Sequence, residues 1–142
     1  MKSFRVLFGG VAFALLASCG GGGGSPTEPL LSVSGLWIVT SQLLQNTCGI
    51  QIPNTTVTNV TITQSGVQLT AQGGDITYSG TIDTRTGNFT ISASTSSGGI
   101  SAVEIISGRF SSNTRFSSES QATFTDGVDS CVIRSSDDGR RQ

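Results

Sequence analysis

The chain of 142 residues contains no histidine, and its single lysine is Lys2. Because histidine and lysine are the usual bases that activate a serine nucleophile, their scarcity argues against nucleophilic catalysis despite the many serines. Without histidine the chain also lacks the ligands for a zinc site, so we expect no metal. Pairs of acids such as Asp126 with Asp129, or Asp137 with Asp138, lie in turn or tail sequence, where we expect them to be solvated. The sequence predicts a protein that is not an enzyme and that uses no cofactor.

Long apolar runs are also scarce, and the clearest one lies near the N-terminus. Val6 to Ala17 form an uncharged run of 12 residues that follows Lys2 and Arg5. As a helix this run would be about 18 Å long, which is well short of the roughly 30 Å of a bilayer's hydrocarbon core. A positive segment before a short apolar run is typical of a secretory signal and not of a membrane span.

The apolar run ends in Leu16-Ala17-Ser18-Cys19. This pattern resembles the lipobox of bacterial lipoproteins, in which the small residues before the cysteine fit the signal peptidase. The resemblance implies that residues 1–18 are removed and that Cys19 becomes an acylated N-terminus, which anchors the protein to a membrane of the bacterial cell envelope. The alternative is an ordinary signal peptide, which would leave Cys19 as an exposed thiol in an oxidising compartment.

Five consecutive glycines, residues 20–24, follow the cysteine. Because glycine has high backbone entropy and no side chain to bury, we expect residues 19–34 to be a flexible tether. In enterobacterial lipoproteins an aspartate directly after the cysteine favours the inner membrane, so Gly20 favours the outer membrane, on its periplasmic or surface face. We expect residues 35–135 to form one domain and residues 136–142 to be a polar, frayed tail.

The part of the chain after the predicted signal peptide is mildly acidic. It contains six arginines and nine acids, which gives a formal charge of −3. A net negative charge predicts no binding of nucleic acid and no electrostatic attraction to an anionic membrane surface. We therefore expect contact with the membrane to come through the N-terminal lipid.

Apolar residues alternate with polar ones through most of the chain, as Val67, Leu69 and Ala71 do with Gln68 and Thr70. This period of two predicts strands with one buried face, and glycine-rich and serine-rich breakers at short spacing predict hairpin turns between them. The expected fold is all-β, a single antiparallel up-and-down β-barrel of about eight strands, with a β-sandwich as the alternative. The predicted strands cover residues 35–44, 57–64, 67–72, 75–83, 88–95, 100–110, 114–124 and 128–135.

The chain has three cysteines, and with Cys19 assigned to the lipid, Cys48 and Cys131 remain. In an oxidising compartment these two are expected to form a disulfide. The bond would tie the first strand region to the last strand. Ends that meet in this way are typical of a closed barrel, although a sandwich could bring them together too.

The predicted first strand begins with Gly35-Leu36-Trp37. This motif resembles the start of lipocalins, avidins and related calycin-like barrels, which implies that Trp37 plugs one barrel end and packs against a basic residue on a late strand. Arg134 is the candidate for that partner. The Thr-Asp-Tyr signature of true lipocalins is missing, and a single tryptophan cannot build the walls of an avidin site. The resemblance therefore implies the barrel but no particular ligand.

Two classes of function fit such a barrel. In the first, the barrel binds a small apolar or amphipathic ligand. The candidate lining residues, for which plain core is the alternative role, are Val39, Ile62, Leu69, Tyr78, Ile91, Phe116 and Phe124. In the second, the domain is a protein–protein interaction module or a protease inhibitor of the envelope, since small bacterial barrel inhibitors of metalloproteases are similar in outline.

Overall fold

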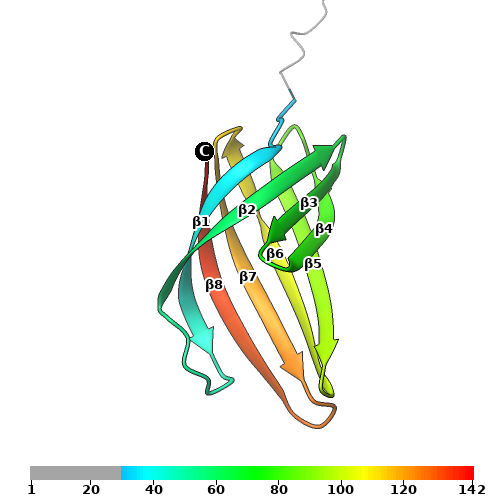
Figure 1. Cartoon of the computed structure of the whole chain (residues 1–142). Coiled ribbons are helices and arrows are strands. Elements are labelled where there is room, and N and C mark those ends of the chain that lie inside the picture. Colours follow the sequence, from blue (N-terminus) through cyan, green and yellow to red (C-terminus); the bar gives the residue numbers. More distant parts are fainter. Residues whose placement is uncertain (1–29) are drawn as a thin grey trace, which may run out of the picture.

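The computed structural model describes residues 30–142, so the predicted signal peptide, Cys19 and the glycine run lie outside the described residues. In this part of the chain eight antiparallel strands follow one another (Figure 1). Each strand pairs with its neighbours in sequence, and the last pairs with the first, which closes a barrel. The strands are β1 Gly35–Asn46, β2 Thr55–Ser65, β3 Gln68–Gly73, β4 Ile76–Ile82, β5 Asn88–Ser97, β6 Ile100–Ser112, β7 Arg115–Thr125 and β8 Ser130–Arg141.

This topology confirms the predicted all-β up-and-down barrel, and the sandwich alternative is wrong. The alternation that predicted the strands also decides which side chains point inward. On β5, for example, Phe89 and Ile91 are buried whereas Thr90 and Ser92 are exposed. Among residues 30–142 no helix is long and apolar enough to cross a membrane.

The apolar core is confined to one end of the barrel, where β1 begins and β8 ends. It contains ten buried hydrophobic residues, which are Val33, Trp37, Ile62, Leu69, Ala71, Ile82, Phe89, Ile91, Phe110 and Phe116. Burying a large aliphatic or aromatic side chain stabilises a fold by about 1.5–3 kcal/mol, so most of the hydrophobic stabilisation comes from this end. The opposite end is closed differently, by a disulfide.

Cys48, in the loop after β1, is bonded to Cys131, near the start of β8. The predicted disulfide is therefore present. It joins residues 83 positions apart in the sequence, and it lies beside a continuation of the β1–β8 pairing, in which the Thr47 amide donates to the carbonyl of Val132 over 2.9 Å. The bond thus fastens the two strands whose pairing closes the barrel.

The predicted polar tail is wrong, because β8 continues to Arg141 and pairs with both β1 and β7. Its inward positions are small or polar, which hides the strand from a search for apolar alternation. Gly139 lies directly under the ring of Phe116, where a Cβ atom would overlap the ring. Asp137 faces inward as well and is 7% exposed. The tail is therefore the strand that closes the barrel.

The predicted end of the tether is also too late in the sequence, because residues 30–34 pack on the barrel. Val33 is fully buried, and its amide donates to Oε1 of Gln64 over 2.9 Å. The Leu31 amide donates to the carbonyl of Thr84 over 3.1 Å. These contacts fix where the chain enters the barrel, at the end that holds the apolar core.

Candidate functional site

Four aromatic side chains fill the barrel at its apolar end. The Trp37 ring centroid lies 5.4 Å from those of both Phe110 and Phe116, and Phe89 lies 4.9 Å from Phe110. Offset and edge-to-face pairs at such distances are worth about 0.5–1.5 kcal/mol each beyond their burial. Trp37 is fully buried, and its indole Nε1 donates to the Val33 carbonyl over 3.0 Å. This cluster leaves Trp37 as a plug of the barrel end.

The proposed partnership between Trp37 and Arg134 is wrong. Arg134 stands in register with Gln45, near the middle of β8, and its guanidinium forms an exposed ion pair with Glu119 at 3.1 Å. The residue opposite Trp37 on β8 is Arg141. Arg141 lies in the stretch for which the sequence predicts a frayed tail, and the register of β8 brings it opposite Trp37. The positions of Gly35 and Trp37 at the start of the first strand match the expectation from the motif.

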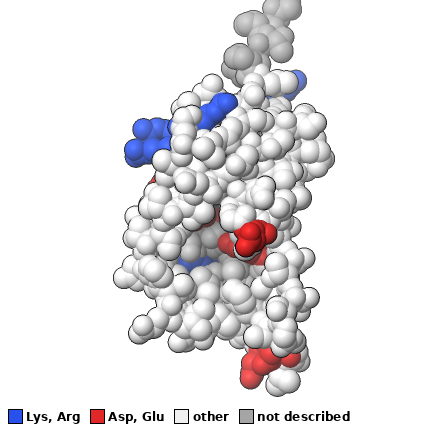
Figure 2. All heavy atoms as spheres, in the orientation of Figure 1, with Lys and Arg blue, Asp and Glu red and all other residues white. Residues whose placement is uncertain are grey.

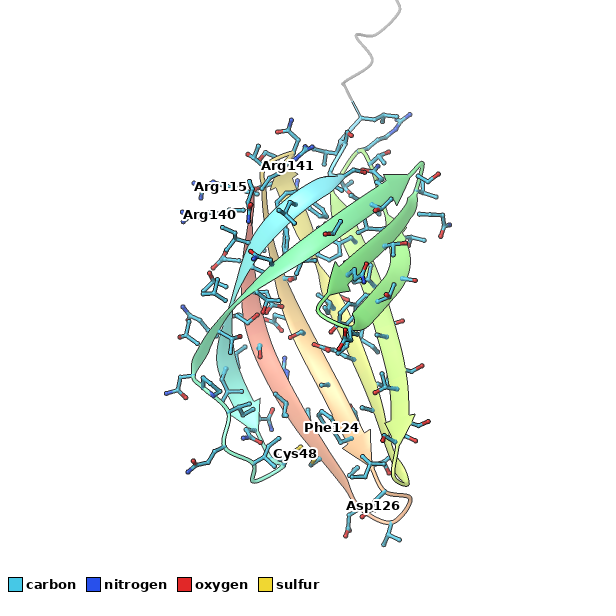
Figure 3. The ribbon with its side chains drawn as sticks, in the orientation of Figure 1. Cys48, Arg115, Phe124, Asp126, Arg140 and Arg141 are labelled. Atoms are coloured by element: carbon cyan, nitrogen blue, oxygen red, sulfur yellow. A yellow bond between two sulfur atoms is a disulfide. The ribbon has the colours of Figure 1, made fainter. Side chains whose placement is uncertain are left out.

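The candidate ligand-lining residues separate into three groups. Four of them, Ile62, Leu69, Ile91 and Phe116, belong to the packed core. Val39 and Tyr78 are half-buried against that core and face the middle of the barrel. Phe124 lies at the opposite end, in a depression of about 330 Å³ beside the disulfide (Figure 3). Only Val39 and Tyr78 therefore border both the core and the more open half of the interior.

The middle of the barrel is polar, beginning with Tyr78 on β4. The Tyr78 hydroxyl donates to Oε2 of Glu104 on β6 over 2.7 Å. Burial, this hydrogen bond and the charges of Glu104 and Asp137 raise the pKa of Tyr78. The phenol therefore stays protonated and acts as a hydrogen-bond donor at physiological pH.

Asp137 on β8 is the second carboxyl group inside the barrel. Its cross-strand neighbours are Ser41 on β1 and Ser118 on β7, and Ser118 donates to its Oδ2 over 3.3 Å. Burial raises the pKa of Asp137 above its ordinary value of 3.8, although hydrogen bonds from Ser41, Ser118 and Ser120 oppose the rise. The carboxyl group of Asp137, surrounded by serine hydroxyl groups, is thus a hydrogen-bond acceptor whose ionised form costs free energy because it is buried.

The wall of the barrel is incomplete beside these groups, because β3 and β4 are short. Pairing between β2 and β3 begins at Val60, and pairing between β4 and β5 ends at Ser92. Residues 55–59 of β2 and 93–97 of β5 therefore have a partner strand on one side only. Figure 1 shows the β3–β4 hairpin covering only part of the space between these strands, and Figure 2 shows a hollow with acidic atoms at its edge. The gap gives access to the polar interior.

Within residues 30–142 the interior polar groups are acceptors or neutral donors, and no arginine side chain is directed into the middle of the barrel. Alternation places the arginines of the strands outside, as for Arg109 and Arg134. Residues 30–142 contain no group of three or more acids and cysteines close enough to hold a metal ion. The expectation that Asp137 is solvated is wrong, because this residue faces the interior and is 7% exposed. Glu104 was not among the predicted site residues, although it alternates with the inward Ala102 and Ile106 on β6.

No protein family and no curated protein matches the chain. The solved structure of EF1p2_mFAP2b bound to DFHBI is similar, with 20% sequence identity and a TM-score of 0.45. The match covers 78% of this chain and 94% of that chain.

Proposed function

We propose that the barrel binds a small amphipathic molecule, which enters through the gap between β2 and β5. The observation that carries the proposal is the divided interior, with an aromatic end sealed by Trp37 and a polar middle around Tyr78 and Asp137. Small-molecule sites in proteins are typically apolar with a few polar groups that orient the ligand. In this barrel the apolar part of the ligand would lie toward Val39 and Val60, and its polar part toward the carboxyl groups.

The polar groups set the chemistry of the ligand. Glu104 already accepts a hydrogen bond from Tyr78, and Asp137 accepts from its serines, so the interior offers acceptor capacity without a positive charge. A ligand with hydrogen-bond donors, such as an amine or a hydroxyl group, would fit this interior better than an acid would. A purely apolar ligand therefore fits this interior less well than an amphipathic ligand with hydrogen-bond donors.

We propose further that the protein is a lipoprotein of the bacterial envelope, anchored through Cys19 and located in the outer membrane. The sequence supports this with a short apolar run, small residues before Cys19 and a glycine tether. The disulfide between Cys48 and Cys131 agrees with an oxidising compartment. The barrel would then act at the membrane surface without catalysis of its own.

Native mass spectrometry of the protein purified from its host tests the binding proposal. We expect a co-purified small molecule that is lost in the Ala122→Phe variant, because Ala122 faces the interior of β7 beside Glu104. Gln121→Phe is the matched control, since Gln121 points outward from the same strand. The proposal would be contradicted if the wild-type protein carried no small molecule and if, after incubation with a host extract, the wild-type and Ala122→Phe proteins retained the same small molecules or none.

A co-purified protein instead of a small molecule would favour the interaction module. The outer face of β6 exposes two apolar side chains, Val103 and Ile105, and these would be the first residues to replace. Each would be changed to serine, as in Val103→Ser, and retention of the partner would be measured.

Metabolic labelling with an alkyne-tagged fatty acid tests the anchor. We expect the label on the mature chain and its complete loss in Cys19→Ala. The double variant Cys48→Ala with Cys131→Ala is the control and should keep the label, because these cysteines form the disulfide. An unlabelled wild-type chain would exclude the anchor and leave the binding proposal untouched.

A further inference from the structure

The net charge of the chain conceals a strong separation of charge along the barrel. We define the tether end as the end formed by residues 30–34, 65–67, 83–87, 109–115 and 140–142, where the described chain begins. Five of the six arginines in residues 30–142 lie there, against one acid in the same ranges, Asp83. Figures 2 and 3 show basic side chains gathered at this end. The five are Arg85, Arg109, Arg115, Arg140 and Arg141.

Contacts between neighbouring turns hold some of these arginines in place. Arg109 donates from Nε to the Thr86 carbonyl over 2.8 Å. Arg141 donates from Nη1 to the carbonyls of Ser32 and Asn113, at 3.5 and 3.4 Å. These hydrogen bonds hold the guanidinium groups of Arg109 and Arg141 at fixed places on the tether end, so this end is positively charged although the whole chain is negative. At the opposite end the loop between β7 and β8 carries two acids, Asp126 and Asp129.

Two of the arginines stand opposite each other on neighbouring strands. Arg115 on β7 is the register partner of Arg140 on β8, and both side chains are exposed. Like charges in this arrangement destabilise a sheet. Among residues 30–142 the ion pair found is the one between Arg134 and Glu119, so neither Arg115 nor Arg140 has a carboxylate within ion-pair distance there. A local cost without a compensating contact in the fold is typical of a functional surface.

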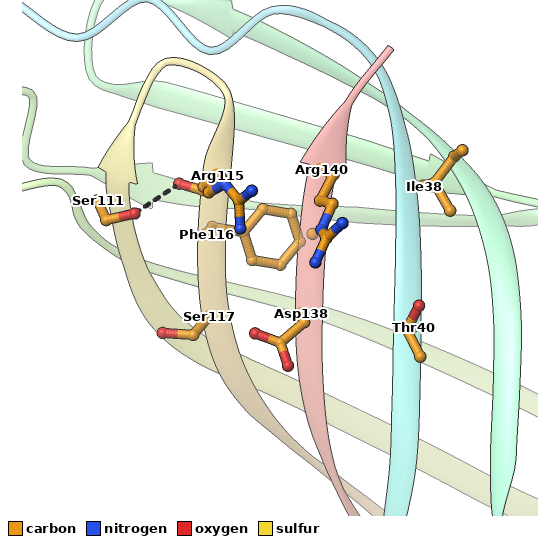
Figure 4. A pocket seen from close by; sticks show the side chains of 9 residues that line it. Ile38, Thr40, Ser111, Arg115, Phe116, Ser117, Asp138 and Arg140 are labelled. Carbon is orange, nitrogen blue, oxygen red and sulfur yellow. Dashed lines mark hydrogen bonds between the residues drawn. The ribbon is translucent and has the colours of Figure 1, made fainter.

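The two arginines border a groove on the outer wall that crosses β6, β7, β8 and β1 (Figure 4). Its volume is about 710 Å³, and its lining includes Ile38, Thr40 and Ser117 as well as Arg115 and Arg140. The carboxylate of Asp138 also lines the groove, between Ser117 and Thr40. The groove thus combines two cations, hydroxyl donors and an exposed apolar side chain, which are the groups that contact a phosphate diester and the start of its acyl chains.

Exposed apolar side chains continue around the same end. Leu30, Leu36 and Val67 are all exposed there. The opposite end exposes apolar residues too, among them Leu44 and Val128, so apolar exposure alone does not distinguish the two ends. The sign of the charge distinguishes the two ends, because a surface that lies in a membrane interface combines apolar side chains with arginine or lysine.

We propose that the tether end of the barrel docks on a bilayer that contains anionic phospholipids, with the groove of Arg115 and Arg140 receiving a headgroup. This surface would be a second contact with the membrane, separate from the acyl anchor proposed at Cys19 and independent of it. A net charge of −3 is compatible with this docking, because within a Debye length of about 8–10 Å the local charge governs the attraction.

Vesicle sedimentation tests this docking with the chain from Gly20 to Gln142, which contains every strand, the core and the disulfide but not the acylated cysteine. We expect binding to phosphatidylglycerol-containing vesicles and not to pure phosphatidylcholine, with loss of binding at high salt. The triple variant Arg85→Gln, Arg115→Gln and Arg140→Gln removes cations whose side chains donate none of the hydrogen bonds described above. It should weaken binding by about 100-fold, since each arginine near the surface contributes roughly 1 kcal/mol.

Arg134→Gln is the matched control, because Arg134 is the one arginine of residues 30–142 that lies outside the tether end. This variant should leave vesicle binding within about two-fold. Equal binding to neutral vesicles, or unchanged binding of the triple variant, would overturn the proposal. No binding to anionic vesicles would also overturn it and would turn attention to an acidic protein as the partner. Because the tested chain lacks Cys19, failure of docking is distinguishable from failure of the anchor.

Discussion

Asp137 illustrates how one residue can conflict with its surroundings and still be retained. The carboxyl group is buried in the barrel, and burial raises its pKa, while Ser41 and Ser118 supply hydrogen bonds that favour the ionised form. A group that is this costly to charge contributes little to stability at neutral pH even with these hydrogen bonds. We therefore expect Asp137 to serve the proposed ligand site, where its carboxyl group would orient a hydrogen-bond donor of the ligand.

The raised pKa predicts how stability depends on pH. An acid whose pKa is higher in the folded state binds more protons when folded, so the protein loses stability as pH rises from about 4 through that raised pKa. Replacing Asp137→Asn should remove this loss, and the difference in Tm between variant and wild type should grow in favour of the variant with rising pH. Thermal unfolding followed by circular dichroism at several pH values measures the difference.

Asp138→Asn is the comparison variant, because Asp138 is the exposed neighbour on the same strand. Its charge is the smallest of the causes that shift the pKa of Asp137, so this variant should change the pH dependence much less than Asp137→Asn does. Contributions from Asp83 and Asp126, whose pKa values are lowered by backbone amides in their turns, cancel in the difference between variant and wild type. A constant offset between wild type and Asp137→Asn over the whole pH range would show that Asp137 titrates alike in the folded and unfolded chains.

Among the strands, β8 shows how packing sets a requirement that sequence alone hides. Gly139 leaves room for the ring of Phe116, and a Cβ atom there would overlap the ring. We expect Gly139→Ala to destabilise the fold by about 1–3 kcal/mol, because Phe116 would have to leave the aromatic cluster. Urea unfolding measures the free energy.

Gly73 provides a matched control in another strand of the same barrel. A Cβ atom on Gly73 would meet a methyl group of Val60 at 3.5 Å and one of Thr58 at 3.8 Å, both of which are ordinary contact distances. Gly73→Ala should therefore change stability by less than about 0.5 kcal/mol. Equal effects of Gly73→Ala and Gly139→Ala would mean that backbone entropy and not the space beside Phe116 governs both positions.

Strand prediction succeeded where one face is apolar and failed where neither face is. The strand around Phe89 and Ile91 was found because these residues alternate with threonine and serine. The second half of β8 was missed because its inward side chains are serine, aspartate and glycine, whose burial depends on partners in other strands. Alternation identifies a buried face only when that face is apolar.

The candidate site was predictable to a similar extent. Trp37 was placed correctly from a three-residue motif, and Tyr78 from alternation. The partner assigned to Trp37 was wrong because the register between β1 and β8 decides which residue stands opposite, and that register follows from closure of the whole barrel. The gap in the wall arises because β3 and β4 are short, and no single residue in the sequence indicates their length.

At the scale of the whole molecule, the two ends of the barrel are built on different principles. The tether end has the aromatic cluster, the buried Val33 and the arginines, whereas the far end relies on the disulfide and on the Thr47 to Val132 hydrogen bonds. Between them lies the polar interior with its lateral gap. The rigid end therefore supports the proposed membrane contact, and the less apolar half holds the proposed ligand.

This division predicts what the disulfide contributes. Cys48 and Cys131 are 83 residues apart, and in the chain-entropy view a crosslink of that span stabilises the fold by up to about 4.5 kcal/mol. The variant Cys48→Ala with Cys131→Ala should lose stability of that order in urea unfolding. Because few apolar contacts replace the bond at the far end, hydrogen exchange should accelerate most at residues 43–47 and 130–134. Amides beside Trp37 and Phe116 should keep measurable protection, and an equal loss at both ends would mean that the barrel opens as a single unit.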